Sequence, residues 1–310
     1  MNKIPHESKR VWEENGVRII DCASCEFIHI DPIPTEEQLL FFYKQRYYKD
    51  IKPFNYDAVT SELIKSTIMQ VQTNQHYRSI YNQVISLLAS KNASVFNMLD
   101  VGCGNDLLSL YFQQQGWETA VIEPNGDAAL YLRNFGIPVY EKFANEINKL
   151  NLKELSFVNI QFVLEHIEDP ISLLNKINEK MVPGGVVRIC VPSDFSEGQL
   201  AYRGYYNEQL RWVVQPDHIN YFTFSSLSKL LCNCGFQEVY RTTNFPLEFL
   251  LLGGLNYYAD EEQQKKVSHI VHHFENAFLS TGYQDKLMKL YESLAQLGMG
   301  RSIFMFAVKR

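Results

Sequence analysis

A twenty-residue stretch, MLDVGCGNDLLSLYFQQQGW (98–117), constrains the fold more than any other part of this 310-residue chain. Its pattern predicts a buried strand, a tight turn and a helix that ends at Gly116. Gly102 and Gly104 follow the strand directly, where glycine lets the backbone turn sharply and approach a ligand without a Cβ in the way. This order of elements is typical of the ligand-binding edge of a parallel sheet.

Strand-like and helix-like segments alternate around this stretch. Strands are expected at 95–102, 119–124, 138–140, 157–163, 186–192 and 236–242, and the segment 302–309 has a similar apolar pattern. Helices are expected at 61–90, 106–115, 128–135, 171–181 and 225–234, the third capped by Asp127 and the fourth opened by Asp169-Pro170. The alternation predicts an α/β fold with a mostly parallel, doubly wound sheet and helices on both of its faces.

Acidic residues around the glycine turn decide which ligand suits it. Asp100 and Asp106 flank the turn, and Glu123 ends the next strand, where a carboxylate can accept hydrogen bonds from two ribose hydroxyls. A dinucleotide site needs a third glycine where Leu107 stands, and the two acids repel a pyrophosphate. The set fits a cation without phosphate, such as S-adenosyl-L-methionine (SAM). A purely structural turn and an NAD-dependent oxidoreductase are the alternatives.

Five motifs in chain order carry a resemblance to a known family: LDVGCGND (99–106), VIEPN (121–125), VLEHIEDP (163–170), MVPGGVVRICVP (181–192) and DHINYFTFSSLSKLLCNCGF (217–236). Together they resemble the class I SAM-dependent methyltransferases, and more narrowly the bacterial branch that modifies sugars, cell-surface glycans or small metabolites. The resemblance implies a Rossmann-like, seven-stranded sheet whose last strand, about 302–309, runs antiparallel. It also implies SAM as the cofactor and S-adenosylhomocysteine (SAH) as its product.

The resemblance carries the family's cofactor contacts onto positions of this chain. It implies that the methionine end of SAM contacts Asp100, Gly102, Cys103 and Gly104; that the ribose contacts Glu123; that the adenine lies beside Pro124, Asn125 and Phe143; and that Gln161, Phe162 and Val163 lie beneath the sulfonium. The chain departs from the family at Asp106, where a third glycine is usual, and at Ser156, where an acid is frequent. Neither departure removes a group that does chemistry.

Two histidines are candidates for the base that methyl transfer to a hydroxyl requires. His218, preceded by Asp217, lies in a long segment after the strand at 186–192, within a stretch, DHINYFT, that resembles an element of sugar C-methyltransferases. That element carries an earlier tyrosine where Gln215 stands, which favours an oxygen or nitrogen acceptor and leaves carbon methylation as an alternative. His166 follows the strand at 157–163 and is the second candidate. For both histidines, bracing of the local loop is the alternative role.

The segments outside the core carry one further motif. The N-terminal segment, 1–58, contains Cys22-x-x-Cys25, which in related proteins is often half of a four-cysteine zinc knuckle. No earlier cysteine pair exists, so we expect a degenerate ribbon and cap held by packing, without a metal; His6 or His29 as substitute ligands are the alternative. Residues 59–244 are expected to form the SAM-binding core. A helical insertion, 245–298, would then cover the substrate or form a homodimer face, and 299–310 would supply the last strand.

Composition narrows the class of partner. The net charge of −6 comes without a basic run, so we expect neither a nucleic acid nor an anionic membrane as partner. The longest apolar run, near 247–255, is too short to span a bilayer, and the N-terminus lacks a signal-peptide core, so the expected compartment is the cytoplasm.

These observations together predict a SAM-dependent methyltransferase. We expect it to act on an oxygen or nitrogen of a sugar-containing or other small metabolite, with His218 as general base. A SAM-binding module without turnover is the alternative from outside the enzymes.

Overall fold

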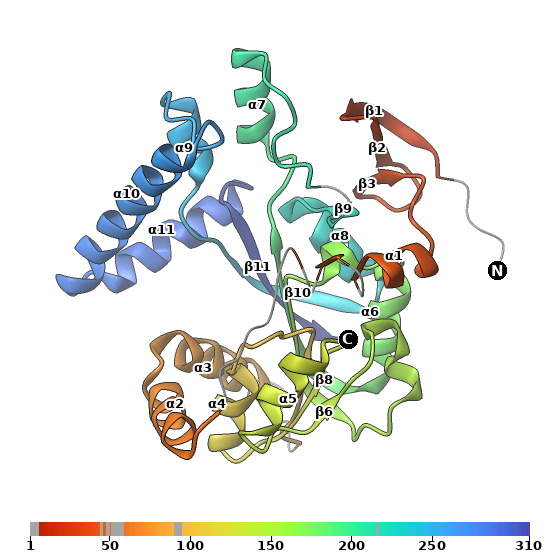
Figure 1. The fold of residues 1–310 in the computed structure, drawn as a ribbon, viewed down its shortest axis with the longest axis vertical. Helices are drawn as coiled ribbons and strands as arrows, with labels where there is room; N and C mark the ends of the chain where they lie inside the picture. The colour runs from red at the N-terminus through yellow and green to blue at the C-terminus, as the bar shows by residue number, and fades with distance from the viewer. Residues whose placement is uncertain (1–5, 44–45, 48–49, 51–58, 90–94, 215–216) are drawn as a thin grey trace. The chain divides into compact units, whose positions relative to one another are not determined.

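The computed structural model describes residues 6–310 apart from 44–45, 48–49, 51–58, 90–94 and 215–216. The chain forms two compact units (Figure 1). Unit 1 comprises Met1–Ile33, Cys190–Leu230 and Tyr240–Met305, and unit 2 comprises Pro34–Ile189, Leu231–Val239 and Phe306–Arg310. The four segments expected from the sequence stay a prediction.

A seven-stranded sheet in the order β10-β11-β8-β7-β4-β5-β6 is the frame of unit 2. Its strands are β4 (Asn97–Val101), β5 (Glu118–Ile122), β6 (Val139–Tyr140), β7 (Leu155–Gln161), β8 (Met181–Pro192), β10 (Phe236–Thr242) and β11 (Ser302–Lys309), of which β8, β10 and β11 continue into unit 1. β4 pairs in parallel with both β5 and β7, and β5 pairs in parallel with β6, whereas the last strand of the chain runs antiparallel. The predicted fold class and sheet are confirmed.

Capping residues divide the helices of unit 2 differently from the sequence expectation. The single helix expected at 61–90 is two helices, α2 (Ser61–Thr73) and α3 (Gln75–Ala89), because Asn74 is extended and its Oδ1 accepts the Tyr77 N–H at 3.0 Å. The expected cap Asp127 lies in the first turn of α5 (Gly126–Arg133), and Asn125 caps that helix by accepting the Ala128 N–H at 2.9 Å. Both differences arise because an asparagine amide satisfies an N–H of a first helical turn.

The other helical segments of unit 2 lie where the sequence pattern predicts helices or next to the strand ends. α6 (Pro170–Lys180) begins after Asp169, which caps it, with Pro170 at the first position as predicted. The rest are α1 (Glu36–Phe42), α4 (Leu108–Gln114), the 3-10 turns η2 (Ala144–Lys149) and η3 (Leu164–His166), and the part of α8 (Phe224–Asn233) that belongs to unit 2.

Aromatic packing between α4 and the sheet anchors the core of unit 2. Phe112 on α4 and Phe157 on β7 are both fully buried, and their rings stack with centroids 5.0 Å apart. Trp117, which follows α4, packs edge-on against Phe112 at 5.0 Å. The contact therefore fixes α4, and with it the glycine turn at its start, against the centre of the sheet.

Unit 1 contains a small antiparallel sheet with the order β1-β2-β3-β9. Its strands are β1 (Ser8–Glu14), β2 (Val17–Cys22), β3 (Ile28–Asp31) and β9 (Asn220–Tyr221). Asn15-Gly16 joins β1 to β2 with φ values of 50° and 77°, the left-handed conformation that a tight two-residue hairpin requires. The pairing of β3 with β9 joins the N-terminal hairpin to the segment that follows His218.

The remaining elements of unit 1 are helices. They are α7 (Glu197–Tyr206), α9 (Leu247–Leu252), α10 (Glu261–Ser280) and α11 (Gln284–Gln296), the last three within the expected helical insertion. Leu287, Tyr291 and Leu294 of α11 form an apolar cluster that Phe274 and Phe278 of α10 cover. In the described part of the chain, we find no helix whose length and hydrophobicity would let it cross a membrane.

Replacing Phe112 by alanine should lower the free energy of unfolding by about 3–5 kcal/mol, because the change leaves a cavity against Phe157 and Trp117. Urea unfolding followed by circular dichroism measures this loss. Phe41→Ala is the matched control, because Phe41 is 67% exposed and its loss should change stability by less than about 0.5 kcal/mol. Equal effects of the two substitutions would contradict the assigned core.

Candidate active site

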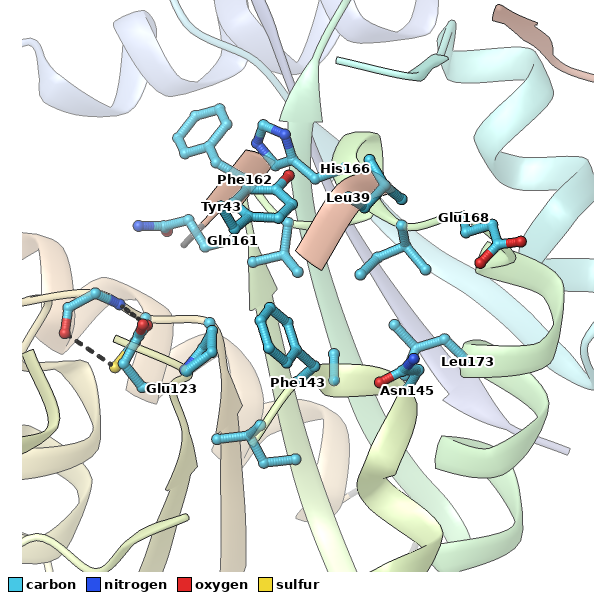
Figure 2. A pocket seen from close by; sticks show the side chains of 18 of the residues that line it. Leu39, Tyr43, Glu123, Phe143, Asn145, Gln161, Phe162, His166, Glu168 and Leu173 are labelled. Carbon is cyan, nitrogen blue, oxygen red and sulfur yellow. Dashed lines mark hydrogen bonds between the residues drawn. The ribbon is translucent and has the colours of Figure 1, made fainter. Parts of the chain in front are cut away.

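A cavity of about 520 Å³ in unit 2 opens at the carboxyl ends of β4, β5 and β7. Figure 2 shows Glu123, Phe143 and Gln161 around it, with Leu39 and Tyr43 contributed by α1 and the residue after it. Nine of the eleven cofactor residues predicted from the sequence line this cavity: Gly102, Cys103, Gly104, Glu123, Pro124, Phe143, Gln161, Phe162 and Val163. The other two, Asp100 and Asn125, lie behind the lining.

The glycine turn is held in a conformation that side chains would disrupt. Gly102 has a φ of 66° and its N–H donates to the Ile122 carbonyl at 2.7 Å. A Cβ on Gly102 would lie 2.6 Å from Cγ2 of Val163, which is too close for any real contact. Gly104 is also left-handed, with a φ of 58°. Gly102 therefore meets both a conformational and a steric requirement of the turn.

Glu123 connects the glycine turn to the next loop. Its side chain is 3% exposed; Oε2 accepts the Gly104 N–H at 2.8 Å and Oε1 accepts the Asn125 N–H at 2.8 Å. Each carboxylate oxygen has a further lone pair, so the group can still accept hydrogen bonds from a ligand in the cavity. Asn125 thus acts through its backbone on Glu123 and through its side chain on α5.

The Asp106 side chain has a structural role at the end of the turn. Its Oδ1 accepts the Leu108 N–H at 2.8 Å, which satisfies a donor at the start of α4 that has no partner within the helix. The Tyr77 hydroxyl accepts the neighbouring Leu107 N–H at 3.3 Å. Burial and then the Asp106 charge raise the pKa of Tyr77 well above its usual value. The acid in place of a third glycine therefore satisfies a backbone donor at the start of α4, just before the N-cap residue Leu107.

A buried polar chain runs beneath the cavity. Asp100 is fully buried, and its Oδ1 accepts a hydrogen bond from Asn159 Nδ2 at 2.7 Å. Asn159 Oδ1 in turn accepts from the buried Arg188 guanidinium at 2.7 Å, and the same nitrogen donates to Gln161 Oε1 at 2.9 Å. Burial and then the Asp106 charge raise the pKa of Asp100 to about 7, against the lowering effects of Asn159 and Arg188.

Sequence reasoning missed Asn159 and Arg188. Each is a polar residue with apolar neighbours on both sides in a buried strand, β7 or β8, and such interruptions are the signal that could have identified them. Ser156, the second departure from the family, is also buried, and its hydroxyl donates to the Asn97 carbonyl at 3.2 Å. This hydrogen bond links β7 to β4, and it does not require an acid at position 156.

The catalytic candidates fall in different units. His166 lines the cavity near Tyr43 (Figure 2), and the ring centroids of the two residues are 6.3 Å apart. The Tyr47 ring lies 6.2 Å from that of His166. Asp217 and His218 belong to unit 1; within it, His218 Nε2 lies 3.9 Å from Asp217 Oδ2. Gln215, whose identity bears on the acceptor atom, lies outside the described residues.

Residues 73–240, more than half of the chain, match the family model described as a methyltransferase domain. The chain belongs to the class I SAM-dependent methyltransferases. The family match confirms the coarser part of the sequence prediction, an enzyme that uses SAM. The comparison of this sequence with curated proteins found no match.

Solved structures with a similar fold share little sequence with this methyltransferase. A SAM-dependent methyltransferase from Archaeoglobus fulgidus is 20% identical, with a TM-score of 0.45, and the match covers 75% of this chain and 94% of that one. The plantazolicin methyltransferase BamL is 15% identical, with a TM-score of 0.47 and coverages of 88% and 94%. The 1,6-didemethyltoxoflavin-N1-methyltransferase of Burkholderia thailandensis is 12% identical, with a TM-score of 0.47 and coverages of 96% and 97%. At these identities they carry no information on the acceptor of this chain.

The raised pKa of Asp100 predicts that SAM affinity increases with pH. The cationic groups of SAM favour the ionised carboxylate, so binding below pH 7 must release the Asp100 proton, whereas binding above pH 7 need not. We expect the association constant to rise up to about tenfold per pH unit below 7 and to level off above it.

Calorimetric titrations between pH 5.5 and 8.5 measure this dependence. Asp100→Asn is the control, because it keeps the hydrogen bond with Asn159 and removes the titrating proton, so that only the titration of the SAM amine remains. The same pH profile for Asp100→Asn and the wild type would show that Asp100 does not titrate on binding.

Proposed function

We propose that this methyltransferase transfers the methyl group of SAM to an oxygen or nitrogen of a sugar-containing or other small metabolite. The observation that carries the proposal is the cavity at the glycine turn, which is lined by acids and contains the ends of three parallel strands. An acid-lined turn stabilises a cationic ligand and repels a phosphate. Part of the same proposal is that the enzyme works in the cytoplasm, with 245–298 as substrate cover or dimer face.

The lining residues suit the three parts of SAM in order along the cavity. In this proposal the methionine end lies at Gly102, Cys103 and Gly104, with Asp100 supplying negative charge from behind the turn. Glu123 accepts the ribose hydroxyls through the lone pairs that its backbone contacts leave unused. Pro124 and Phe143 provide apolar surface for the adenine.

The reaction demands little more than alignment and proton removal. SAM supplies a methyl group on a positively charged sulfur, and Gln161, Phe162 and Val163 would lie beneath that sulfur. We propose His218 as the base that takes the acceptor's proton, with Asp217 beside it stabilising the imidazolium that forms. His166, at the cavity wall among tyrosine rings, is the competing candidate. Carbon methylation of a sugar and SAM binding without turnover remain the alternative functions.

Binding measurements test the cofactor assignment. In calorimetry the wild type should bind SAM and SAH saturably and should not bind NAD, because the acids around the turn repel a pyrophosphate. Glu123→Gln should weaken SAM and SAH binding about 10- to 100-fold, since a neutral amide cannot accept both backbone N–H groups and the ribose.

Glu118→Gln is the matched control for this substitution. Glu118 lies at the exposed start of the same strand, β5, where it pairs with Lys153 at the surface, so binding should change less than about twofold. NAD binding, or wild-type SAM affinity in Glu123→Gln, would overturn the assignment.

Turnover measurements separate the two histidines. His218→Ala should lower kcat about 10²- to 10⁴-fold, with SAM affinity unchanged, because a positioned base contributes a factor of this size. His166→Ala should lower kcat less and should alter cofactor affinity, since His166 lines the cofactor cavity. SAH release over a panel of sugars, phenols and amines gives the rates, and Glu118→Gln, at the exposed start of β5, is the control. Full turnover by His218→Ala would make the base assignment wrong.

A further inference from the structure

Four side chains of the kind that bind zinc meet in unit 1, outside the cofactor cavity. They are His6, Cys22, Cys25 and His29, and one donor atom from each lies within 4.8 Å of all the others. The sequence alone predicts no metal here, because no second cysteine pair precedes Cys22. The fold instead brings two histidines to the two cysteines. We propose that these four residues form a tetrahedral zinc site.

The distances between the donor atoms approach those of a coordinated ion. His6 Nδ1 lies 3.5 Å from Cys22 Sγ and 3.5 Å from Cys25 Sγ. A zinc ion bound at about 2.3 Å by sulfur and about 2.0–2.1 Å by nitrogen gives tetrahedron edges of about 3.3–3.8 Å. The two measured nitrogen–sulfur distances already fall in this range, so closing the tetrahedron needs movements of about 1 Å or less elsewhere.

The backbone shapes the Cys22–Cys25 turn in the manner of a metal-binding knuckle. Cys22 ends β2, and the Cys25 N–H donates to Cys22 Sγ at 3.3 Å, a contact that stabilises a thiolate. Glu26 adopts a φ of 62°, and its N–H donates to the Cys22 carbonyl at 3.0 Å, which turns the chain back into β3. The Ala23 N–H donates to the Glu7 carbonyl at 2.7 Å, which holds the N-terminal segment beside the turn.

His29 is oriented as a metal ligand by its other ring nitrogen. Its Nδ1 lies 2.8 Å from the Ile30 carbonyl oxygen, which can only accept, so Nδ1 carries the hydrogen and Nε2 carries the lone pair. The side chain is fully buried, and Nε2 has no hydrogen-bond partner among the described residues. A backbone carbonyl that fixes one nitrogen while the other faces the ion is the usual outer contact of a zinc-bound histidine. A bound cation would remove the free-energy cost of burying Nε2 without a hydrogen-bond partner.

The donor set identifies both the ion and its role. Two sulfurs and two imidazole nitrogens in a tetrahedral arrangement favour Zn²⁺ among the divalent ions. All four positions belong to the protein, so no open position is left for a water or substrate, and the site would be structural.

The proposed zinc site would stabilise β3, which pairs with the short strand that follows His218. His29 lies on β3 opposite Asn220 of β9, and the Ile30 N–H donates to the Ile219 carbonyl at 3.0 Å. The residue before this contact is His218. Zinc would therefore fix β3, which is hydrogen-bonded to the residue that follows His218, independently of how the cofactor binds in unit 2.

Metal analysis of the full chain, expressed without a polyhistidine tag and purified under reducing conditions, tests the proposal. We expect about one zinc per chain by mass spectrometry. Cys22→Ser and His29→Ala should lose it, and His6→Cys should keep it, because three cysteines and one histidine also hold zinc. Cys232→Ser and His272→Ala are matched controls, since both residues are exposed and lie outside the cluster. These two variants should retain wild-type zinc.

Cobalt replacement gives a readout that needs no variant. Exchange of zinc for Co²⁺ in the wild type should give the intense visible bands of a tetrahedral ion and a thiolate-to-cobalt charge-transfer band. A wild type with less than about 0.1 zinc per chain that also fails to bind Co²⁺ tetrahedrally would overturn the proposal. Zinc retained by Cys22→Ser would overturn it as well, as would a Cys22–Cys25 disulfide under reducing conditions, which intact mass shows as a loss of two hydrogens.

Discussion

The carboxylate of Glu123 is the contact on which the shape of the glycine turn depends. It accepts one backbone N–H from the glycine turn and one from the following loop, and so joins the ends of β4 and β5 into one surface. Turns of this kind have few side chains to hold them, since glycine contributes none. A single buried acid therefore sets the shape of the turn and also supplies the group that a ribose can meet.

Buried charged and polar side chains lie beneath the glycine turn. Asp100, Asn159 and Arg188 form a continuous hydrogen-bonded chain within the sheet, and Asp106 and Glu123 add negative charge around it. Burial, and after it the Asp106 charge, raises the pKa of the Asp100 carboxyl to about 7, so the surroundings of Asp100 disfavour its negative charge. Such an arrangement favours a positively charged ligand, because the ligand offsets the repulsion among the carboxylates of Asp100, Asp106 and Glu123. The geometry is thus compatible with an acid at position 106, where the related family usually has a glycine.

Much of this site could be predicted from the sequence, because it is local. The strand, the turn and Glu123 lie within about 25 residues, and their order alone implies a common edge of the sheet. The sequence could not predict that Asn125, and not Asp127, caps α5. Either side chain can accept a backbone N–H of a first helical turn, and the direction in which the chain enters the helix determines which one does. The pairing of Arg188 with Asn159 was equally hidden, because the two residues lie on different strands and pairing across a sheet leaves no fixed spacing in the sequence.

The N-terminal cluster illustrates the same limit. His6 and His29 lie on opposite sides of the cysteine pair, one before β1 and one within β3, and only the hairpin register brings their nitrogens to the sulfurs. A search for a second Cys-x-x-Cys misses such a set, since the ligands come from three separate segments.

A crystal structure with SAH bound tests the central claim most directly. The account predicts SAH in the cavity of unit 2, with both ribose hydroxyls within about 2.6–3.0 Å of the Glu123 carboxylate while the Gly104 N–H still donates to it. SAH bound elsewhere, or a Glu123 side chain turned away from both the ribose and the glycine turn, would contradict it.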